Sequence, residues 1–147
     1  MMTLDSVEAV VKFHNGFRSK PYNSETKKKL ASRSVGKICI GYGRDLGKGL
    51  TEEEAEYLLR HDIDKIFDEL QNALPKWTRI DKVRQAVLID MCDAIGIKRV
   101  LSKEEFITLL VNGLWRDAAN EIAGIKSRRA DRWRHMITTG EWPSIGA

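Results

Sequence analysis

The chain has 147 residues, which is the length of one ordinary domain. Hydrophobic residues make up 42% and charged residues 31%, and this composition excludes both a disordered chain and a membrane-spanning one. The net charge of +4 favours anionic partners in general. We therefore expect a soluble globular protein, a monomer without membrane insertion.

The first residues contain no basic leader followed by an apolar core, so we expect no signal peptide and a cytoplasmic location. Cys39 and Cys92 fit no metal spacing, and in a cytoplasmic setting they stay reduced. No cofactor or metal is expected. Basic residues concentrate in 26-TKKKLASRSVGK-37 and 126-KSRRADRWR-134. Each stretch fits a solvated surface, and equally a contact with nucleic acid, an anionic cell-wall polymer or an acidic protein.

The first predicted element is a helix over residues 3–14. Asp5 and Glu8 have a capping-box spacing, and Gly16 is a natural end. One helical face carries the apolar residues Val7, Val10, Val11 and Phe13.

From residue 17 to residue 49, frequent glycine, proline and serine indicate a small β-hairpin region with a lysine-rich loop at its tip. Ile38 and Ile40 alternate as in a short strand. Thr51 and Glu54 form a capping box that begins a long helix ending before Pro75. The apolar stripe of this helix consists of Ala55, Leu58, Leu59, Ile63, Ile66, Phe67 and Leu70.

The remaining chain is predicted to be helical. One helix has the stripe Val83, Ala86, Val87, Met91, Ala94 and Ile95 and ends at Gly96. Ser102 and Glu105 are expected to cap a shorter helix that ends near Gly113. A further helix runs from Leu114 to Ile122, and a last one from Ser127 to Gly140. Trp77, Trp115, Trp133 and Trp142 are expected in packing positions. The predicted fold class is α+β, mostly α.

Several segments, in order, resemble the phage-type lysozymes, the muramidases that include bacteriophage T4 lysozyme. The segment 14-HNGFRSKPY-22 is similar to the family's EGxRxxxY signature, and 36-GKICIGYGR-44 to its GxxTIGxG strand. The segment 51-TEEEAEYLLRHDI-63 resembles the start of the inter-lobe helix, and 129-RADRWRHMITTGEW-142 the terminal helix. The resemblance implies one lysozyme-like domain over 1–147, with a small lobe at 15–60. The helical lobe would comprise 61–147 together with helix 3–14.

The three positions that the resemblance makes catalytic are all substituted. A general acid Glu is expected where Asn15 stands, an Asp where Ser24 stands, and a water-holding Thr where Cys39 stands. Glycoside hydrolysis normally needs two carboxyl groups. An amide holds no transferable proton, and losing general-acid help alone costs roughly 10²–10⁴-fold in rate. We therefore expect a binding protein without muramidase activity, which recognises peptidoglycan or an anionic macromolecule.

Three alternatives would preserve chemistry. A relocated carboxylate could come from Glu25, Asp45, Asp90 or Asp93, giving an active endolysin that cleaves β-1,4 links. Deamidation of the Asn15–Gly16 pair would restore an acid. Cys39 with His14 could act as a thiol nucleophile and its base.

The cleft itself should carry further binding residues. The resemblance places Arg129 where the family has an arginine that pairs with the catalytic Glu. Here this guanidinium either binds a ligand carboxylate or phosphate or pairs with another acid, Asp93 or Asp131 for instance. The other expected cleft residues are Tyr22, Arg44, Asp90 and Asp93. The loop 23–37 looks longer than in the family, 123–129 looks shorter, and the expected basic loop residues are Lys27, Lys28, Lys29 and Arg33.

Overall fold

The computed structural model describes residues 6–23 and 37–144 of the chain. These residues belong to two compact units, Met1–Glu56 and Tyr57–Ala147. The boundary lies close to the lobe boundary expected after residue 60. Ser24, Glu25 and the basic loop residues Lys27, Lys28, Lys29 and Arg33 lie outside the described residues.

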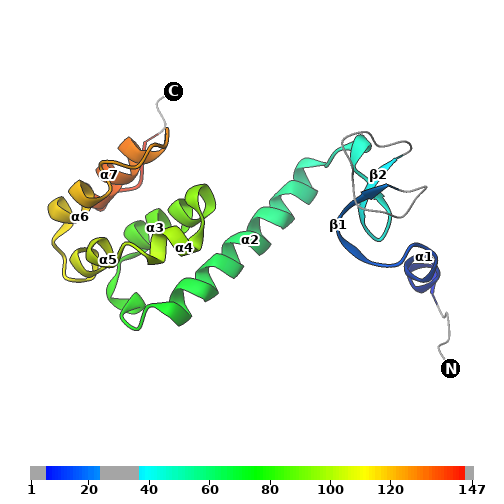
Figure 1. Ribbon diagram of the computed structural model, residues 1–147, viewed down its shortest axis with the longest axis horizontal. Coiled ribbons are helices and arrows are strands. Elements are labelled where there is room, and N and C mark those ends of the chain that lie inside the picture. Colours follow the sequence, from blue (N-terminus) through cyan, green and yellow to red (C-terminus); the bar gives the residue numbers. More distant parts are fainter. Residues whose placement is uncertain (1–5, 24–36, 145–147) are drawn as a thin grey trace. The chain divides into compact units, whose positions relative to one another are not determined.

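The first unit contains a short helix and a small sheet (Figure 1). Helix α1 spans Val7–Asn15, and the three strands are β1 (Arg18–Asn23), β2 (Ile38–Gly41) and β3 (Arg44–Asp45). The sheet is antiparallel in the order β1-β2-β3. A 3₁₀ helix, η1, follows at Leu46–Lys48.

Two local predictions for this unit need correction. The N-cap of α1 is Ser6, whose hydroxyl accepts from the Ala9 amide, because a serine one residue closer to the helix competes with Asp5 for this place. In β2 the buried side chain is Cys39, 4% exposed, whereas Ile38 is 37% exposed. Alternation is present as predicted, but the smaller residue faces inward.

Helix α2, Glu52–Ala73, begins with the predicted capping box, which is confirmed. The Glu54 amide donates to the Thr51 hydroxyl at 3.2 Å, and Glu54 Oε1 accepts from the Thr51 amide at 3.1 Å. Of the predicted stripe, only Leu70 is buried, and Ile66 and Phe67 pack against the core of the second unit.

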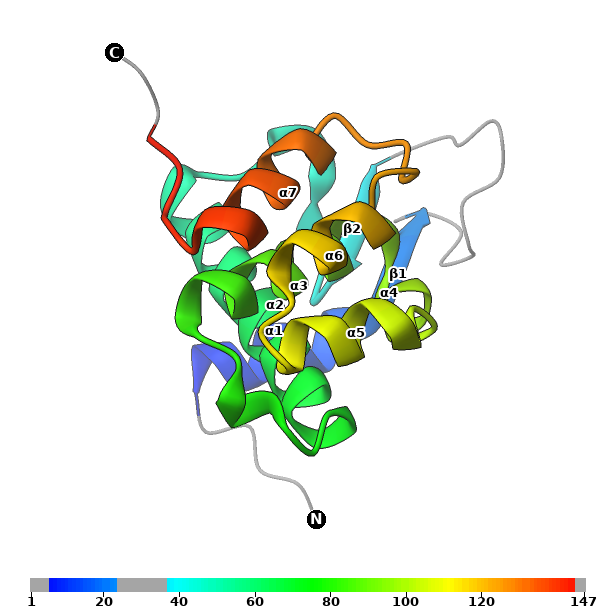
Figure 2. The ribbon, with the colours of Figure 1, turned by 90° about the vertical axis from the view of Figure 1, so that its left-hand side faces the viewer.

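The second unit consists of helices (Figures 1 and 2). After the 3₁₀ helix η2 (Trp77–Arg79) come α3 (Lys82–Ile95), α4 (Ile97–Leu101), α5 (Glu104–Val111), α6 (Trp115–Glu121) and α7 (Ala130–Thr139). Helix α6 contacts both α5 and α7, and α3 contacts both α4 and α7. Together with the small sheet, this confirms the predicted α+β, mostly α class.

Differences in this unit again concern caps and tryptophans. Ser102 does not begin α5. It ends α4, and its hydroxyl donates to the Arg99 carbonyl at 2.7 Å. Trp77 and Trp133 are buried, as expected, but Trp115 is 40% and Trp142 63% exposed. Helical spacing alone did not separate buried from exposed tryptophans.

The core of the second unit draws on every one of its helices. Its fully buried large side chains come from α2, η2 and each later helix except α6, which adds Ala118 and Ala119. Cys92 belongs to this core, and burial raises the pKa of its thiol to about 11, with a further contribution from the Glu69 charge. Both cysteines are free and buried, so neither is set up as a reactive thiol.

One charged side chain is buried within this core. Arg84 of α3 is 4% exposed, and its Nε donates to the Ile137 carbonyl of α7 at 2.8 Å. The guanidinium also contacts Asp81 at 3.0 Å and lies 3.4 Å from the centre of the Trp115 ring. Arg84 thus links α3, α6 and α7.

Helix α7 is followed by Gly140, which adopts φ +69°. A Cβ at this position would lie 2.8 Å from Arg84 Nη1.

No helix among the described residues is both long and apolar enough to cross a membrane.

Candidate functional site

Asn15, which stands where the resemblance expects a general acid, is the last residue of α1. Its side-chain amide donates to the Val11 carbonyl at 3.2 Å. Its carboxamide also lies against the turn between β2 and β3, since a Cβ at Gly43 would be 2.8 Å from Asn15 Cγ. Gly43 has φ +86°, so the turn requires glycine for both its conformation and this close contact. The side chain is therefore held in place, but it carries no ionisable proton.

Cys39, which stands where the resemblance expects a threonine, lies in the middle strand of the sheet. It pairs with Tyr22 on β1 and with Asp45 on β3. Cys39 is 4% and Tyr22 3% exposed, and the Arg18 guanidinium lies 5.1 Å from the Tyr22 ring centre. A thiol is a weak hydrogen-bond donor, so it holds a water molecule less well than a threonine hydroxyl would. In the described part of the chain no hydrogen bond joins Cys39 to His14, whose ring packs on Phe13.

Arg44, an expected cleft residue, is fully engaged within its own unit. It makes two hydrogen-bonded contacts with Glu54, from Nη1 to Oε2 at 2.6 Å and from Nη2 to Oε1 at 2.8 Å. The Arg44 hydrogen bond, with those from Thr51, lowers the pKa of Glu54 to about 2. Arg44 thus fastens β3 to the start of α2.

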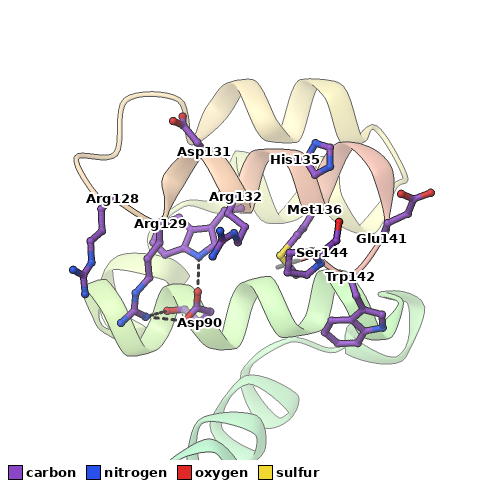
Figure 3. Close-up of a pocket in the computed structure, with 12 residues that line it drawn as sticks. Asp90, Arg128, Arg129, Asp131, Arg132, His135, Met136, Glu141, Trp142 and Ser144 are labelled. Carbon is purple, nitrogen blue, oxygen red and sulfur yellow. Dashed lines mark hydrogen bonds and ion pairs between the residues drawn. The ribbon is translucent and has the colours of Figure 1, made fainter. Parts of the chain in front are cut away.

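Arg129 lies at the N-terminal end of α7 and contacts two carboxylates of α3, of which Figure 3 shows Asp90. Its Nη1 donates to Asp90 Oδ1 at 2.7 Å and to Asp93 Oδ2 at 3.0 Å. Hydrogen bonding to Asp93 and the charge of Asp90 raise the pKa of the Arg129 guanidinium. Of the two predicted alternatives, the structure therefore contains the pairing with an acid. Asp131 instead pairs with Arg134.

Trp133 completes this cluster and was not predicted as part of it. Its indole N–H donates to Asp90 Oδ2 at 2.8 Å, so both Asp90 oxygens accept hydrogen bonds. Trp133 is 1% exposed. Its spacing four residues after Arg129, on the same face of one helix, was the available signal.

The cluster lines one end of a pocket of about 760 Å³ in the second unit. Arg128 and Arg129 lie at this end, and Glu141 and Trp142 lie at the other (Figure 3). Within residues 6–23 and 37–144, neither Arg128 nor Arg132 has an ion-pair partner. In the same ranges, no group of three or more histidine, cysteine or acidic side chains could hold a metal ion.

The carboxylates considered as replacement acids already have partners where they are described. Asp45 Oδ1 accepts from the Gly47 amide at 2.9 Å and caps η1. Asp90 and Asp93 share the Arg129 guanidinium. Each of these carboxylates thus accepts hydrogen bonds that hold neighbouring parts of its own unit together. Glu25, like Ser24, lies outside the described residues.

A family model described as phage lysozyme matches residues 12–137, which include α1 from Lys12, the sheet and nearly all of α7. No curated protein matches the chain.

Proposed function

The chain belongs to the phage lysozyme family, and from this premise we propose that it binds peptidoglycan glycan without hydrolysing it. One observation carries the proposal: an amide, Asn15, stands at the position that the resemblance gives to the general acid. Because its nitrogen donates to the Val11 carbonyl and its carboxamide packs on Gly43, the site is ordered and filled, yet it lacks acid chemistry.

Bond cleavage would need both a proton for the leaving oxygen and a second carboxylate. Ser24 supplies no negative charge at the second position, and Cys39 offers only a weak donor at the third. The loss of the general acid alone lowers the rate roughly 10²–10⁴-fold. The partners of Asp45, Asp90 and Asp93 support the same conclusion, since each is engaged in holding the fold.

The test compares binding with hydrolysis on the same substrate. Purified murein is incubated with the protein, and both co-sedimentation and release of reducing ends are measured. We expect co-sedimentation and no release above buffer. The triple variant Asn15→Glu, Ser24→Asp, Cys39→Thr is expected to gain measurable release, because it restores the acid, the second carboxylate and the hydroxyl.

Family membership favours a second candidate, an active endolysin with a relocated acid. Glu25 adjoins the substituted Ser24 and is the acid to test first. Release of reducing ends by the wild-type protein, lost in Glu25→Gln or Asp90→Asn, would establish that candidate and overturn the first. A mass increase of about one dalton localised to the Asn15 peptide would identify deamidation as the source of the acid.

A further inference from the structure

We propose that the edge of the Arg129 guanidinium formed by Nε and Nη2 recognises a carboxylate carried by the glycan. Asp90 and Trp133 are its positioning residues. This inference rests on the proposed function, because it names the chemical group of the peptidoglycan glycan that the protein would recognise. It concerns the end of the pocket at which Arg128 and Arg129 lie (Figure 3).

One edge of the Arg129 guanidinium has no hydrogen-bond partner among the described residues. Every hydrogen bond of its guanidinium within the described ranges leaves from Nη1, toward Asp90 and Asp93. Its Nε and Nη2 therefore have no partner in those ranges. The side chain is 37% exposed. A guanidinium that is held through one nitrogen, and whose Nε and Nη2 are unpaired, can donate two parallel N–H bonds to a planar anion.

Trp133 and Asp90 hold this edge in one orientation. The buried Trp133 indole donates to Asp90 Oδ2 at 2.8 Å, and Asp90 Oδ1 accepts from Arg129 at 2.7 Å. The chain of contacts thus runs from a rigid core side chain to the guanidinium. Because little side-chain freedom remains to be lost on binding, a contact made by this edge keeps more of its interaction free energy.

The charge balance of the pocket favours a directional contact over general attraction of polyanions. The charged side chains that line it are three arginines, Arg128, Arg129 and Arg132, and three acids, Asp90, Asp131 and Glu141, so their formal charges sum to zero. A neutral cluster gives little long-range pull on a phosphodiester polymer, whose binding depends on many cations and falls steeply with salt. The planar Arg129 guanidinium can still bind a carboxylate in a bidentate way.

Peptidoglycan can present a carboxylate from two sources. One is the lactyl group of muramic acid where no stem peptide is attached, and the other is the stem peptide itself, whose amide bond to the lactyl group removes the lactyl carboxylate. Three ligands separate them: a peptide-free muramoyl–glucosamine tetrasaccharide, the same glycan carrying its stem peptides, and chitotetraose, which has a similar backbone without a carboxylate. Calorimetric titration of the full chain measures the affinity for each. We expect the peptide-free tetrasaccharide to bind more tightly than chitotetraose if the lactyl group is the source, and the peptide-bearing glycan to do so if the stem is the source.

The variants test the edge and its positioning separately. Arg129→Lys keeps the charge but loses the planar fork, and we expect about tenfold weaker binding of the carboxylated ligand with chitotetraose unchanged. Trp133→Phe keeps a ring in the core but removes the N–H that orients Asp90, and a smaller loss, about threefold, is expected for the same ligand alone. Arg79→Lys, at an exposed arginine in the same unit, is the matched control.

The outcomes distinguish this inference from the proposed function. Equal binding of all three glycans, unaffected by Arg129→Lys, would overturn the inference and leave glycan binding intact. Absence of binding to every glycan and to murein would overturn both. Competition by a single-stranded oligonucleotide at equal concentration, with a steep salt dependence, would also contradict the inference, because it would assign the site to a polyanion.

Discussion

The two compact units differ most in how much apolar surface each keeps away from water. Every member of the large buried cluster lies in the second unit, from Leu70 to Ile137. Among the described residues of the first unit, the buried ones are Tyr22, Asn23 and Cys39. Helix α1 contains no buried residue.

The buried apolar cluster and the two candidate residues Asn15 and Cys39 thus lie in different units. Hydrophobic burial is the dominant favourable term in folding, so the helical unit supplies most of it. Asn15 and Cys39, by contrast, lie in the unit with few buried side chains. Changes at those two positions are therefore expected to alter chemistry more than they alter folding.

The largest effect on the free energy of unfolding is expected from a leucine-to-alanine change, which can be compared between the two units. Leu88 is fully buried in α3 and Leu50 is 54% exposed. We expect Leu88→Ala to lower the free energy of unfolding by about 2–5 kcal/mol, since it leaves a cavity in the core. Leu50→Ala should change it by no more than about 0.5 kcal/mol. Urea denaturation measures both, and equal losses would show that Leu50 is covered to the same degree.

A smaller effect tests the prediction that helix 3–14 belongs to the helical lobe. If its apolar face is covered in the folded chain, Val11→Asp places a charge in an apolar contact and should cost about 1–3 kcal/mol. Glu8→Gln on the same helix is the control, because it weakens only a surface pair with Lys12. An unchanged unfolding midpoint for Val11→Asp would contradict the prediction and leave α1 as part of the first unit alone.

The smallest effect concerns pH and the Arg44–Glu54 contact. The pKa of Glu54 lies at about 2 in the folded chain, below its ordinary value of 4.5, chiefly because Glu54 accepts a hydrogen bond from Arg44. A lowered folded-state pKa contributes stability above pH 4.5, and this contribution is lost as the pH falls toward 2. We expect the difference in thermal midpoint between the wild-type protein and Glu54→Gln to shrink over that window.

Glu53→Gln is the matched control for this pH series, since Glu53 is an exposed neighbour on the same turn of α2. A difference for Glu54→Gln that stayed constant from neutral pH down to pH 2 would contradict the assignment of the contact. High salt should reduce the difference at neutral pH, because the pair is exposed to solvent.

The fold could be predicted because periodic patterns and caps are local signals. The Thr51–Glu54 box, Gly96 and Gly140 each mark a helix end where the sequence places it. Helix α4 was not predicted, since five residues are too few to display a period. Exposure of Trp115 and Trp142 was missed because it depends on contacts between helices, which spacing within one helix does not contain.

The elements that carry the candidate residues could be predicted, but the pairings of these residues could not. Asn15 ends the first helix and Cys39 lies in the strand expected around Ile38 and Ile40. By contrast, the partner of Arg129 depends on how α7 packs against α3, and the link from Trp133 through Asp90 depends on side-chain orientation across the same pair of helices. Such contacts join residues far apart in the chain, beyond the reach of a local pattern.

The position of Arg84 limits how related chains can diverge. Its guanidinium occupies the space that any side chain at Gly140 would need. A larger residue at 140 requires that the arginine first be replaced by something shorter. Among descendants of this chain, a side chain at position 140 should therefore occur only where Arg84 has also been replaced, a correlation that sequence collections can reveal without any measurement on the protein.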